Sequence, residues 1–308
     1  MREKIVVFGS SFVDLMGRTP HLPIPGETVK GTTFCQGPGG KGFNQAVAAH
    51  KAGADVTMIT KLGKDALANT PLNIMRELNM PTDGIFFHET AATGCALILV
   101  DENTAQNEIV VLPGACDTIS AEDIAEVTDE IRNAKYLLLQ LEVNQDANEA
   151  VAKIAKEAGI RLVINTAPYQ PMTDDFLHGA YLVTPNEVEA EEMTGIAISD
   201  LESADRAAQV FFEKGVQNVV ITMGSRGAYL NDGTQSGIIP PFSVKAVDTT
   251  GAGDAFNGGL LAALAEGKTL WEAGRFASAL AALSVQRIGT TNAMPTREEI
   301  DSFLSERS

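Results

Sequence analysis

The sequence has few basic residues, few aromatic residues and no long apolar run. Lysine and arginine number 23 against 40 acidic residues, so the net charge is -17 at pH 7. The negative electrostatic field of such a chain repels a phosphate backbone, and the sequence contains no local basic patch to reverse it. We therefore expect no nucleic-acid partner. The apolar runs all fall short of the roughly 20 residues that a membrane-spanning helix requires, so we expect no membrane role.

Cysteine and histidine are also scarce. Cys35, Cys95 and Cys116 are an odd number at unrelated spacings, which is typical of reduced thiols in the cytosol rather than of a disulfide framework. The four histidines form no paired-ligand pattern, which argues against a zinc site. The chain enters an apolar pattern at Ile5 without the features of a secretory signal, so we expect a cytoplasmic protein.

Short β-branched runs alternate with amphipathic helical stretches along most of the chain. This rhythm predicts an α/β fold in which helices cover a parallel sheet. The expected strands are residues 5–8, 56–60, 136–140, 161–165, 181–184 and 219–222, with a further short strand at 245–247. Several helix ends are readable: Ser120 with Asp123 as a capping box, Pro71 in a first turn, and Gly159, Gly195 and Gly215 as C-terminal caps.

Two stretches interrupt the rhythm. The first begins at residue 10, and the second contains a predicted hairpin of residues 94–101 and 107–112 with no crossover helix. We interpret both, at about residues 10–36 and 92–114, as one small sheet inserted into a single catalytic domain of residues 1–308. Such a sheet can close over a pocket at the carboxyl ends of the main strands, where open α/β sheets bind ligands.

A run of small residues at Gly251, Ala252 and Gly253 opens an apolar helix. Small residues let a phosphate approach the backbone, and the free N–H groups at a helix start form an anion site. Asp254 lies within that site, where a carboxylate would repel a phosphate but can accept a proton from an attacking hydroxyl. We therefore expect Asp254 to be a catalytic base, the alternative being a tight helix start with an acidic first turn.

A second glycine-rich segment spans residues 37–44 and leads into a helical pattern at residues 45–51. Its glycines satisfy G-x-G-x-x-G, but the match follows polar residues instead of a long first strand, so we reject a dinucleotide site. A Walker A loop fails too, because Gly42 stands where its Ser or Thr belongs. What remains is a loop that exposes its backbone and ends in Asn44, whose amide suits the hydroxyls of a polyol such as a sugar.

Residues 39–63 and 248–261, in this order and at this separation, resemble the two signature patterns of the ribokinase family of carbohydrate kinases, the phosphofructokinase B type. The resemblance covers the whole chain. It implies a three-layer α/β fold with a mostly parallel central sheet and a small inserted β-sheet lid. It also implies ATP-dependent phosphorylation of the 5-hydroxyl of a pentose, with D-ribose as the leading sugar and 2-deoxy-D-ribose close behind, and a homodimer formed through the lid sheets.

The resemblance also assigns site residues. The sugar pocket would contain Phe12, Asp14, Gly40, Lys41, Asn44, Glu142 and Asp254. ATP would contact Asn186, Thr222, Gly224, Ser225, Gly227, Gly251, Ala252, Gly253 and Ser278. Asn186 and Glu189 would organise Mg²⁺ through water, whereas Asp248, Thr250, Ser284, Arg287 and Gly289 would bind K⁺, mostly through backbone carbonyls. Taken without the resemblance, Asn186 and Glu189 indicate only a helix start with an N-cap asparagine.

Phe12 departs from the family pattern, which commonly has an asparagine at this position. Its side chain cannot hydrogen-bond, so the pocket loses a hydroxyl contact and 2-deoxyribose becomes a serious candidate. Alternatively, Phe12 is a core residue of the lid, and Ser11 or a water makes the polar contact.

Two other functions stay open. One is a nucleoside kinase of the same fold, against which the low aromatic content counts. The other is a non-catalytic sugar-binding protein, against which the intact Asp254, Gly253 and Asn44 count.

Overall fold

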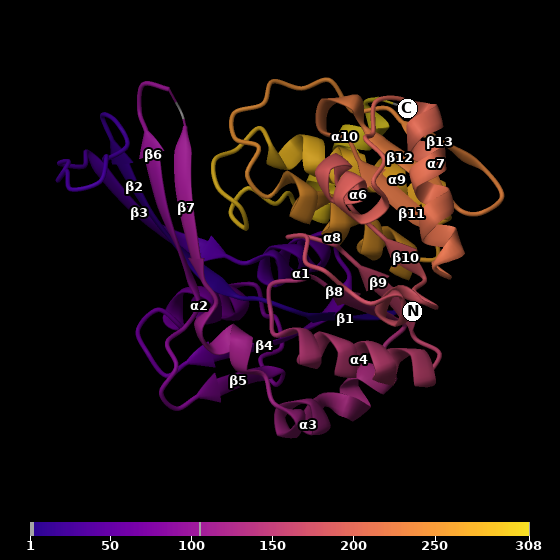
Figure 1. Cartoon of the computed structure of the whole chain (residues 1–308), viewed down its shortest axis with the longest axis horizontal. Helices are drawn as coiled ribbons and strands as arrows, with labels where there is room; N and C mark the ends of the chain where they lie inside the picture. The colour runs from indigo at the N-terminus through magenta and orange to yellow at the C-terminus, as the bar shows by residue number, and fades with distance from the viewer. Residues whose placement is uncertain (1–2, 105, 308) are drawn as a thin grey trace.

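Two β-sheets organise the computed structural model, which describes residues 3–104 and 106–307 (Figure 1). The larger sheet has nine strands in the spatial order β13 (Ser236–Ile239), β12 (Ala228–Asn231), β11 (Val219–Thr222), β10 (Leu182–Val183), β9 (Arg161–Ile164), β8 (Tyr136–Leu139), β1 (Lys4–Phe8), β4 (Asp55–Gly63) and β5 (Ile85–His88). The strands from β11 to β5 pair in parallel, and only β12 and β13 are antiparallel additions at one edge. The mostly parallel α/β sheet expected from the sequence is therefore confirmed.

Helices cover both faces of this sheet. One face packs against α1 (Lys41–Lys51), α8 (Ala252–Ala265), α9 (Leu270–Ser284) and α10 (Arg297–Ser305), with α2 (Asn69–Glu77) beside them. The other face packs against α3 (Ala121–Arg132), α4 (Gln145–Glu157), α5 (Asp174–Leu177), α6 (Glu187–Thr194) and α7 (Leu201–Glu213). Short 3₁₀ segments occur at Gly114–Thr118 and Gly224–Arg226. The result is the expected three-layer arrangement.

The central strands bury side chains on both faces. In β1, Ile5 and Val7 belong to the apolar cluster under α1 and α8, whereas Val6 and Phe8 belong to the cluster on the opposite face. All four side chains have no exposed area. Because a parallel strand between two helical layers is apolar on both sides, its sequence is a continuous apolar run instead of an alternating one.

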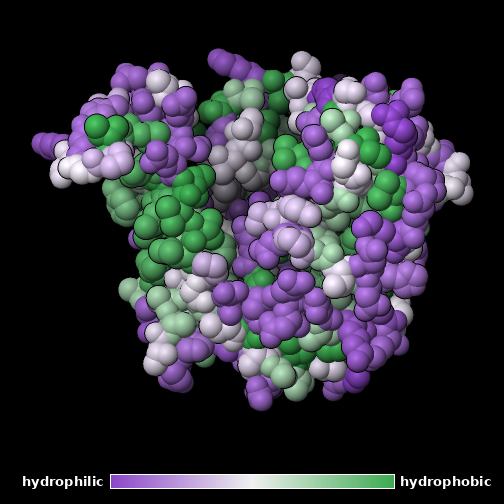
Figure 2. All heavy atoms as spheres, viewed as in Figure 1, coloured by the Kyte–Doolittle hydropathy of each residue, from purple (hydrophilic) through white to green (hydrophobic). Residues whose placement is uncertain are grey.

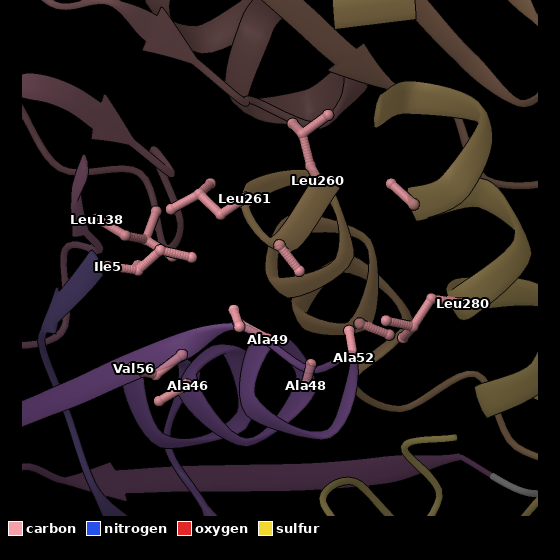
Figure 3. Close-up of a cluster of buried hydrophobic side chains, with 14 of the residues drawn as sticks. Ile5, Ala46, Ala48, Ala49, Ala52, Val56, Leu138, Leu260, Leu261 and Leu280 are labelled. Atoms are coloured by element: carbon pink, nitrogen blue, oxygen red, sulfur yellow. The ribbon is translucent and has the colours of Figure 1, made fainter. Parts of the chain in front are cut away.

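Helices α1 and α8 cross at very short range. Figure 3 shows the alanines of α1, among them Ala48 and Ala49, facing the helix that carries Leu260 and Leu261. A Cβ added at Gly258 of α8 would lie 2.5 Å from Cβ of Ala48. The small residues of both helices therefore allow their backbones to approach. This approach brings together the N-terminal turns of α1 and α8, each of which begins in a glycine-rich segment.

The smaller sheet has the strand order β3 (Thr33–Gly39), β2 (Phe12–Thr19), β6 (Cys95–Asp101) and β7 (Asn107–Leu112). The hairpin of β6 and β7 is confirmed, although Ala105 in its turn lies outside the described residues. The sheet extends away from the nine-stranded body, and Figure 2 shows the molecule hollowed between the two. The expectation of one domain with two insertions stays a prediction, and β3 runs three residues beyond the expected boundary at residue 36.

The predicted strand at residues 245–247 is wrong. The N–H groups of Val247 and Asp248 instead donate to the carbonyl of Val285 just beyond α9, and among the described residues no strand pairs with this segment. Other boundaries also differ from the predictions. Helix α1 begins at Lys41 rather than at residue 45, β4 extends to Gly63 rather than ending at residue 60, and β10 keeps only Leu182 and Val183.

The predicted helix ends are confirmed. Ser120 and Asp123 form a capping box, and Pro71 lies in the first turn of α2. The three predicted C-terminal glycines have positive φ angles between 70° and 86°. Within the described residues, no helix combines the length and the apolar character needed to cross a membrane.

Candidate active site

The N-terminus of α8 combines free backbone donors with a buried carboxylate. Gly251, with φ at +74°, turns the chain into the helix, and the N–H of Ala252 donates to the carbonyl of Thr249 at 3.2 Å. Among the described residues, the N–H groups of Gly253 and Asp254 meet no acceptor. They are thus available to an anion, and the helix dipole favours negative charge at this point.

Asp254 is held by two amides from the first turns of α1. Nδ2 of Asn44 donates to Oδ2 of Asp254, and Nε2 of Gln45 donates to Oδ1, both at 2.9 Å. Burial raises the pKa of Asp254 to about 6, although Lys41 and the two amides act in the opposite direction. A carboxyl group with this pKa is ionised at neutral pH and can still take up a proton during a reaction.

Asp14 and Glu142 face the same region as Asp254. Burial, together with the negative charges of Glu142 and Asp254, raises the pKa of Asp14 to about 6. Oε2 of Glu142 accepts hydrogen bonds from the hydroxyl of Ser10 and from the N–H of Lys41. These carboxylates offer acceptors to the hydroxyl groups of a polyol.

Lys41 and Asn44 complete this cluster. Burial lowers the pKa of the Lys41 ammonium, but the carboxylates of Asp254, Glu142 and Glu189 raise it by more, so Lys41 stays charged. Oδ1 of Asn44 is buried and has no hydrogen-bond partner among the described residues. A buried amide oxygen without a partner is unfavourable, and a ligand hydroxyl can satisfy it.

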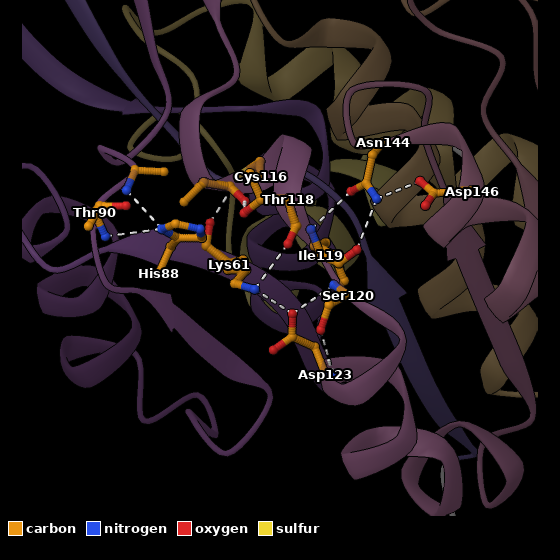
Figure 4. Close-up of polar contacts among 12 residues, drawn as sticks. Lys61, His88, Thr90, Cys116, Thr118, Ile119, Ser120, Asp123, Asn144 and Asp146 are labelled. Carbon is orange, nitrogen blue, oxygen red and sulfur yellow. Dashed lines mark hydrogen bonds and ion pairs between the residues drawn. The ribbon is translucent and has the colours of Figure 1, made fainter.

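Asn144, two residues after Glu142 in the sequence, hydrogen-bonds to the segment that precedes α3 (Figure 4). The side chain of Asn144 accepts from the N–H of Ile119 at 3.1 Å and donates to its carbonyl at 2.9 Å. Close by, the buried ammonium of Lys61 pairs with Asp123 and donates to the carbonyl of Thr118. The Asn144 contacts therefore tie the loop that carries Glu142 to the start of α3.

Phe12 lies mainly in the core. Its side chain has 2% exposed area, and a Cβ added at Gly94 would lie 2.4 Å from its ring. This placement favours the alternative in which Phe12 is a core residue at the base of the lid. Its role in sugar binding stays a prediction.

A cleft of about 340 Å³ lies beside the anion site. Its lining includes the expected ATP residues Thr222, Gly224, Ser225, Gly227, Ala252, Gly253 and Ser278. A more polar cavity of about 220 Å³ shares Thr222, Thr249, Ala252 and Gly253 with the cleft and also contains Gly251, Asn186, Lys41 and Asp254. The two spaces therefore adjoin, and Asp254 lines the polar one.

Asn186 and Glu189 form a capping box at the start of α6, as their residue types alone predict. Glu189 also lines the polar cavity, and burial raises the pKa of its carboxyl group. In the described ranges, no three Asp, Glu, His or Cys side chains are arranged to hold a metal ion directly. An amide and a carboxylate oxygen facing a cavity suit Mg²⁺, which retains water ligands.

The five residues expected at the K⁺ site lie at one loop junction, where the segment just before α8 meets the end of α9 and the segment after it. The carboxylate of Asp248 accepts from the N–H of Thr250 and the N–H of Gly289, both at 2.9 Å. The N–H of Arg287 donates to the carbonyl of Ser284. The structure thus places these residues together beside the start of α8, and their binding of K⁺ stays a prediction.

Comparison with known proteins decides the family. A family model described as pfkB family carbohydrate kinase matches residues 2–297. This chain belongs to that family. Among relatives of this pfkB-family kinase, a ribokinase of Haemophilus influenzae is 40% identical over 99% of both chains, and a deoxyribokinase of Salmonella typhi is 34% identical over 98% of both. The structure of Arabidopsis thaliana ribokinase complexed with ribose and ATP superposes with a TM-score of 0.92, at 30% identity and 99% coverage of both chains.

Five further residues near Asp254 and Glu142 were not predicted from the sequence. Gln45 contacts Asp254, and Ser10 donates to Glu142. Asn165, Thr184 and Asn257 all line the polar cavity near Asp254. One signal was available for Gln45, a long polar side chain within the apolar run that becomes the buried face of α1.

Proposed function

We propose that this kinase transfers the γ-phosphoryl group of ATP to the 5-hydroxyl of a pentose, D-ribose first and 2-deoxy-D-ribose second. The observation that carries the proposal is the position of Asp254. This carboxylate lines the polar cavity that adjoins the larger cleft, close to Lys41 and Asn44. Beside it are N–H groups of α8 that meet no acceptor among the described residues. The names of the relatives, a ribokinase and a deoxyribokinase, support the same pair of sugars.

The reaction follows from this arrangement. Asp14, Asn44 and Glu142 bind sugar hydroxyls, and Asp254 takes the proton of the 5-hydroxyl as its oxygen attacks the γ-phosphorus in line. The new O–P bond forms as the bond to the bridging oxygen of ADP breaks. The N–H groups of Gly253 and Asp254 stabilise the charge on the transferred group.

Two cations belong to the same proposal. Asn186 and Glu189 would hold Mg²⁺ through water, and the ion would supply positive charge at the phosphates. The loop junction at Asp248 would bind K⁺ and order the start of α8. The enzyme would act in the cytoplasm, where the thiols of its three cysteines stay reduced.

The proposed homodimer would form through the lid sheets. In β7, Ile109, Val110, Val111 and Leu112 are between 46% and 55% exposed. Figure 2 shows hydrophobic side chains gathered where Figure 1 places β6 and β7. An exposed apolar edge strand is a template for pairing with a second copy.

The test is turnover by the wild type and by Asp254→Asn, with ADP release measured on ribose, 2-deoxyribose, fructose and nucleosides. We expect a pentose to give the highest kcat/KM, and Asp254→Asn to lose at least about 10²-fold in kcat while it still binds the sugar. Near-normal turnover by the variant would eliminate Asp254 as the base. A nucleoside as the best acceptor would overturn the substrate assignment.

A further inference from the structure

Gln45 is a buried residue that no part of the proposed reaction uses. Its side chain has no exposed area. Nε2 donates to Oδ1 of Asp254 and to Oδ1 of Asn165, both at 2.9 Å, and Oε1 accepts from Nε2 of Gln140 at 2.8 Å. Both amide hydrogens of Gln45 are therefore engaged, and its oxygen already has a partner. With both amide hydrogens engaged and no exposed area, this side chain has no donor to offer the sugar.

The neighbouring Asn44 differs in this respect. Its Nδ2 donates to Oδ2 of Asp254, but its own Oδ1 has no partner among the described residues. The two oxygens of Asp254 thus have different surroundings. Oδ1 faces the saturated amide of Gln45, whereas Oδ2 lies beside an amide that can still bind a ligand hydroxyl.

The contacts of Gln45 continue into a closed ring of hydrogen bonds. Nδ2 of Asn165 donates to the carbonyl of Thr184 at 2.9 Å. The hydroxyl of Thr184 donates to Oδ1 of Asn257 at 2.6 Å, and Nδ2 of Asn257 donates to the carbonyl of Gly253 at 3.0 Å. The ring therefore returns to the peptide that joins Gly253 to Asp254, so it fixes the carboxylate and the anion site relative to each other.

The charges around Asp254 oppose one another, so the hydrogen bond from Gln45 affects how much of this carboxylate is ionised. Lys41 favours the ionised form of Asp254, Glu142 opposes it, and Asp14 is a further carboxylate close enough to interact. Burial also opposes ionisation, and a hydrogen bond donated to the carboxylate favours it. Losing one of the two side-chain donors that Asp254 has among the described residues therefore leaves less of the base ionised near neutral pH.

We propose that Gln45 is a positioning residue, which holds Oδ1 of Asp254 so that Oδ2 remains the proton-accepting oxygen and the carboxylate stays ionised. This inference rests on the proposed role of Asp254 as the base. Gln45 acts through Asp254 and contacts neither substrate. Its loss therefore affects kcat and the pH profile more than the KM for the sugar.

The test compares the pH dependence of kcat/KM for Gln45→Met with that of the wild type. Methionine has a similar length and no hydrogen-bonding amide. We expect kcat to fall at least about tenfold, the sugar KM to change less than about threefold, and the apparent pKa of the acid limb to rise by about one unit. Gln145→Met, at an exposed glutamine of α4, is the matched control and should leave the profile unchanged.

A second variant keeps the inference testable if Gln45→Met does not fold. Gln45→Glu keeps the volume and places a second carboxyl group beside Asp254, so the acid limb should also move to higher pH. A folded variant with an unchanged acid limb would overturn the inference and leave Gln45 a packing residue. An active Asp254→Asn enzyme, measured in parallel, would instead overturn the proposed function.

Discussion

At the residue scale, the burial of Asp254 that supports its proposed role as the base also destabilises the folded protein. Burial raises the pKa of its carboxyl group from 3.8 to about 6. The folded state therefore binds a proton more tightly than the unfolded chain, and stability falls as the pH rises from about 4 to about 6. The full difference corresponds to about 3 kcal/mol above that window.

Asp254→Asn should consequently stabilise the ligand-free protein at neutral pH. We expect a gain of about 1 kcal/mol in the free energy of unfolding, because an asparagine carries no buried charge but satisfies only one of the two amide donors. Urea unfolding at pH 7.5 and at pH 4 measures the difference, which should shrink at the lower pH. A variant less stable than the wild type at pH 7.5 contradicts this prediction.

The same pKa predicts the acid limb of catalysis. Because the base must be ionised, kcat/KM for the sugar should fall about tenfold per pH unit below about pH 6. Steady-state rates between pH 4.5 and 8.5 measure this limb, with circular dichroism as the control for folding. A limb centred near pH 4 would show that Asp254 is not desolvated in the working enzyme.

At the element scale, the crossing of α1 and α8 determines whether the site assembles. A side chain at Gly258 would collide with Cβ of Ala48 and, at 2.7 Å, with the carbonyl of Gln45. We expect Gly258→Val to lower the free energy of unfolding by about 3 kcal/mol and to reduce kcat, because the two helices must separate. Gly37→Ala, where an added Cβ meets open space, is the control for both measurements.

The edge strand β7 carries the prediction about assembly. Val110→Glu places a charge on the exposed apolar edge, so we expect light scattering to report a monomer where the wild type is a dimer. Ile238→Glu, on the edge strand of the larger sheet, is the matched control and should leave the mass unchanged. A wild-type monomer at micromolar concentration would contradict the proposed homodimer.

The elements also show what sequence patterns can predict. Local signals were sufficient for the strand β1, the capping box at Ser120 and the helix start that holds Asp254, because each depends on neighbouring residues. The strand predicted at residues 245–247 was wrong, because a strand also requires a partner. The contact of Gln45 with Asp254 spans 209 positions, so no local pattern contains it.

At the scale of the whole molecule, the net charge of -17 opposes the approach of an anionic nucleotide. Salt screens such repulsion over a Debye length of about 10 Å at 0.1 M. We therefore expect kcat/KM for ATP to rise by about twofold between 0.02 and 0.2 M tetramethylammonium chloride, at fixed K⁺ and Mg²⁺. A fall would show that the local positive charge at Lys41 dominates the encounter.

The hydrogen bond between Asn44 and Asp254 joins residues 210 positions apart. During translation, a nascent chain that has emerged only as far as β11 already contains the amide of this pair but not the carboxylate. On the role proposed for Asp254, such a ribosome-bound intermediate cannot phosphorylate a sugar. Under that proposal, catalytic competence appears only after α8 has been synthesised and has docked on α1.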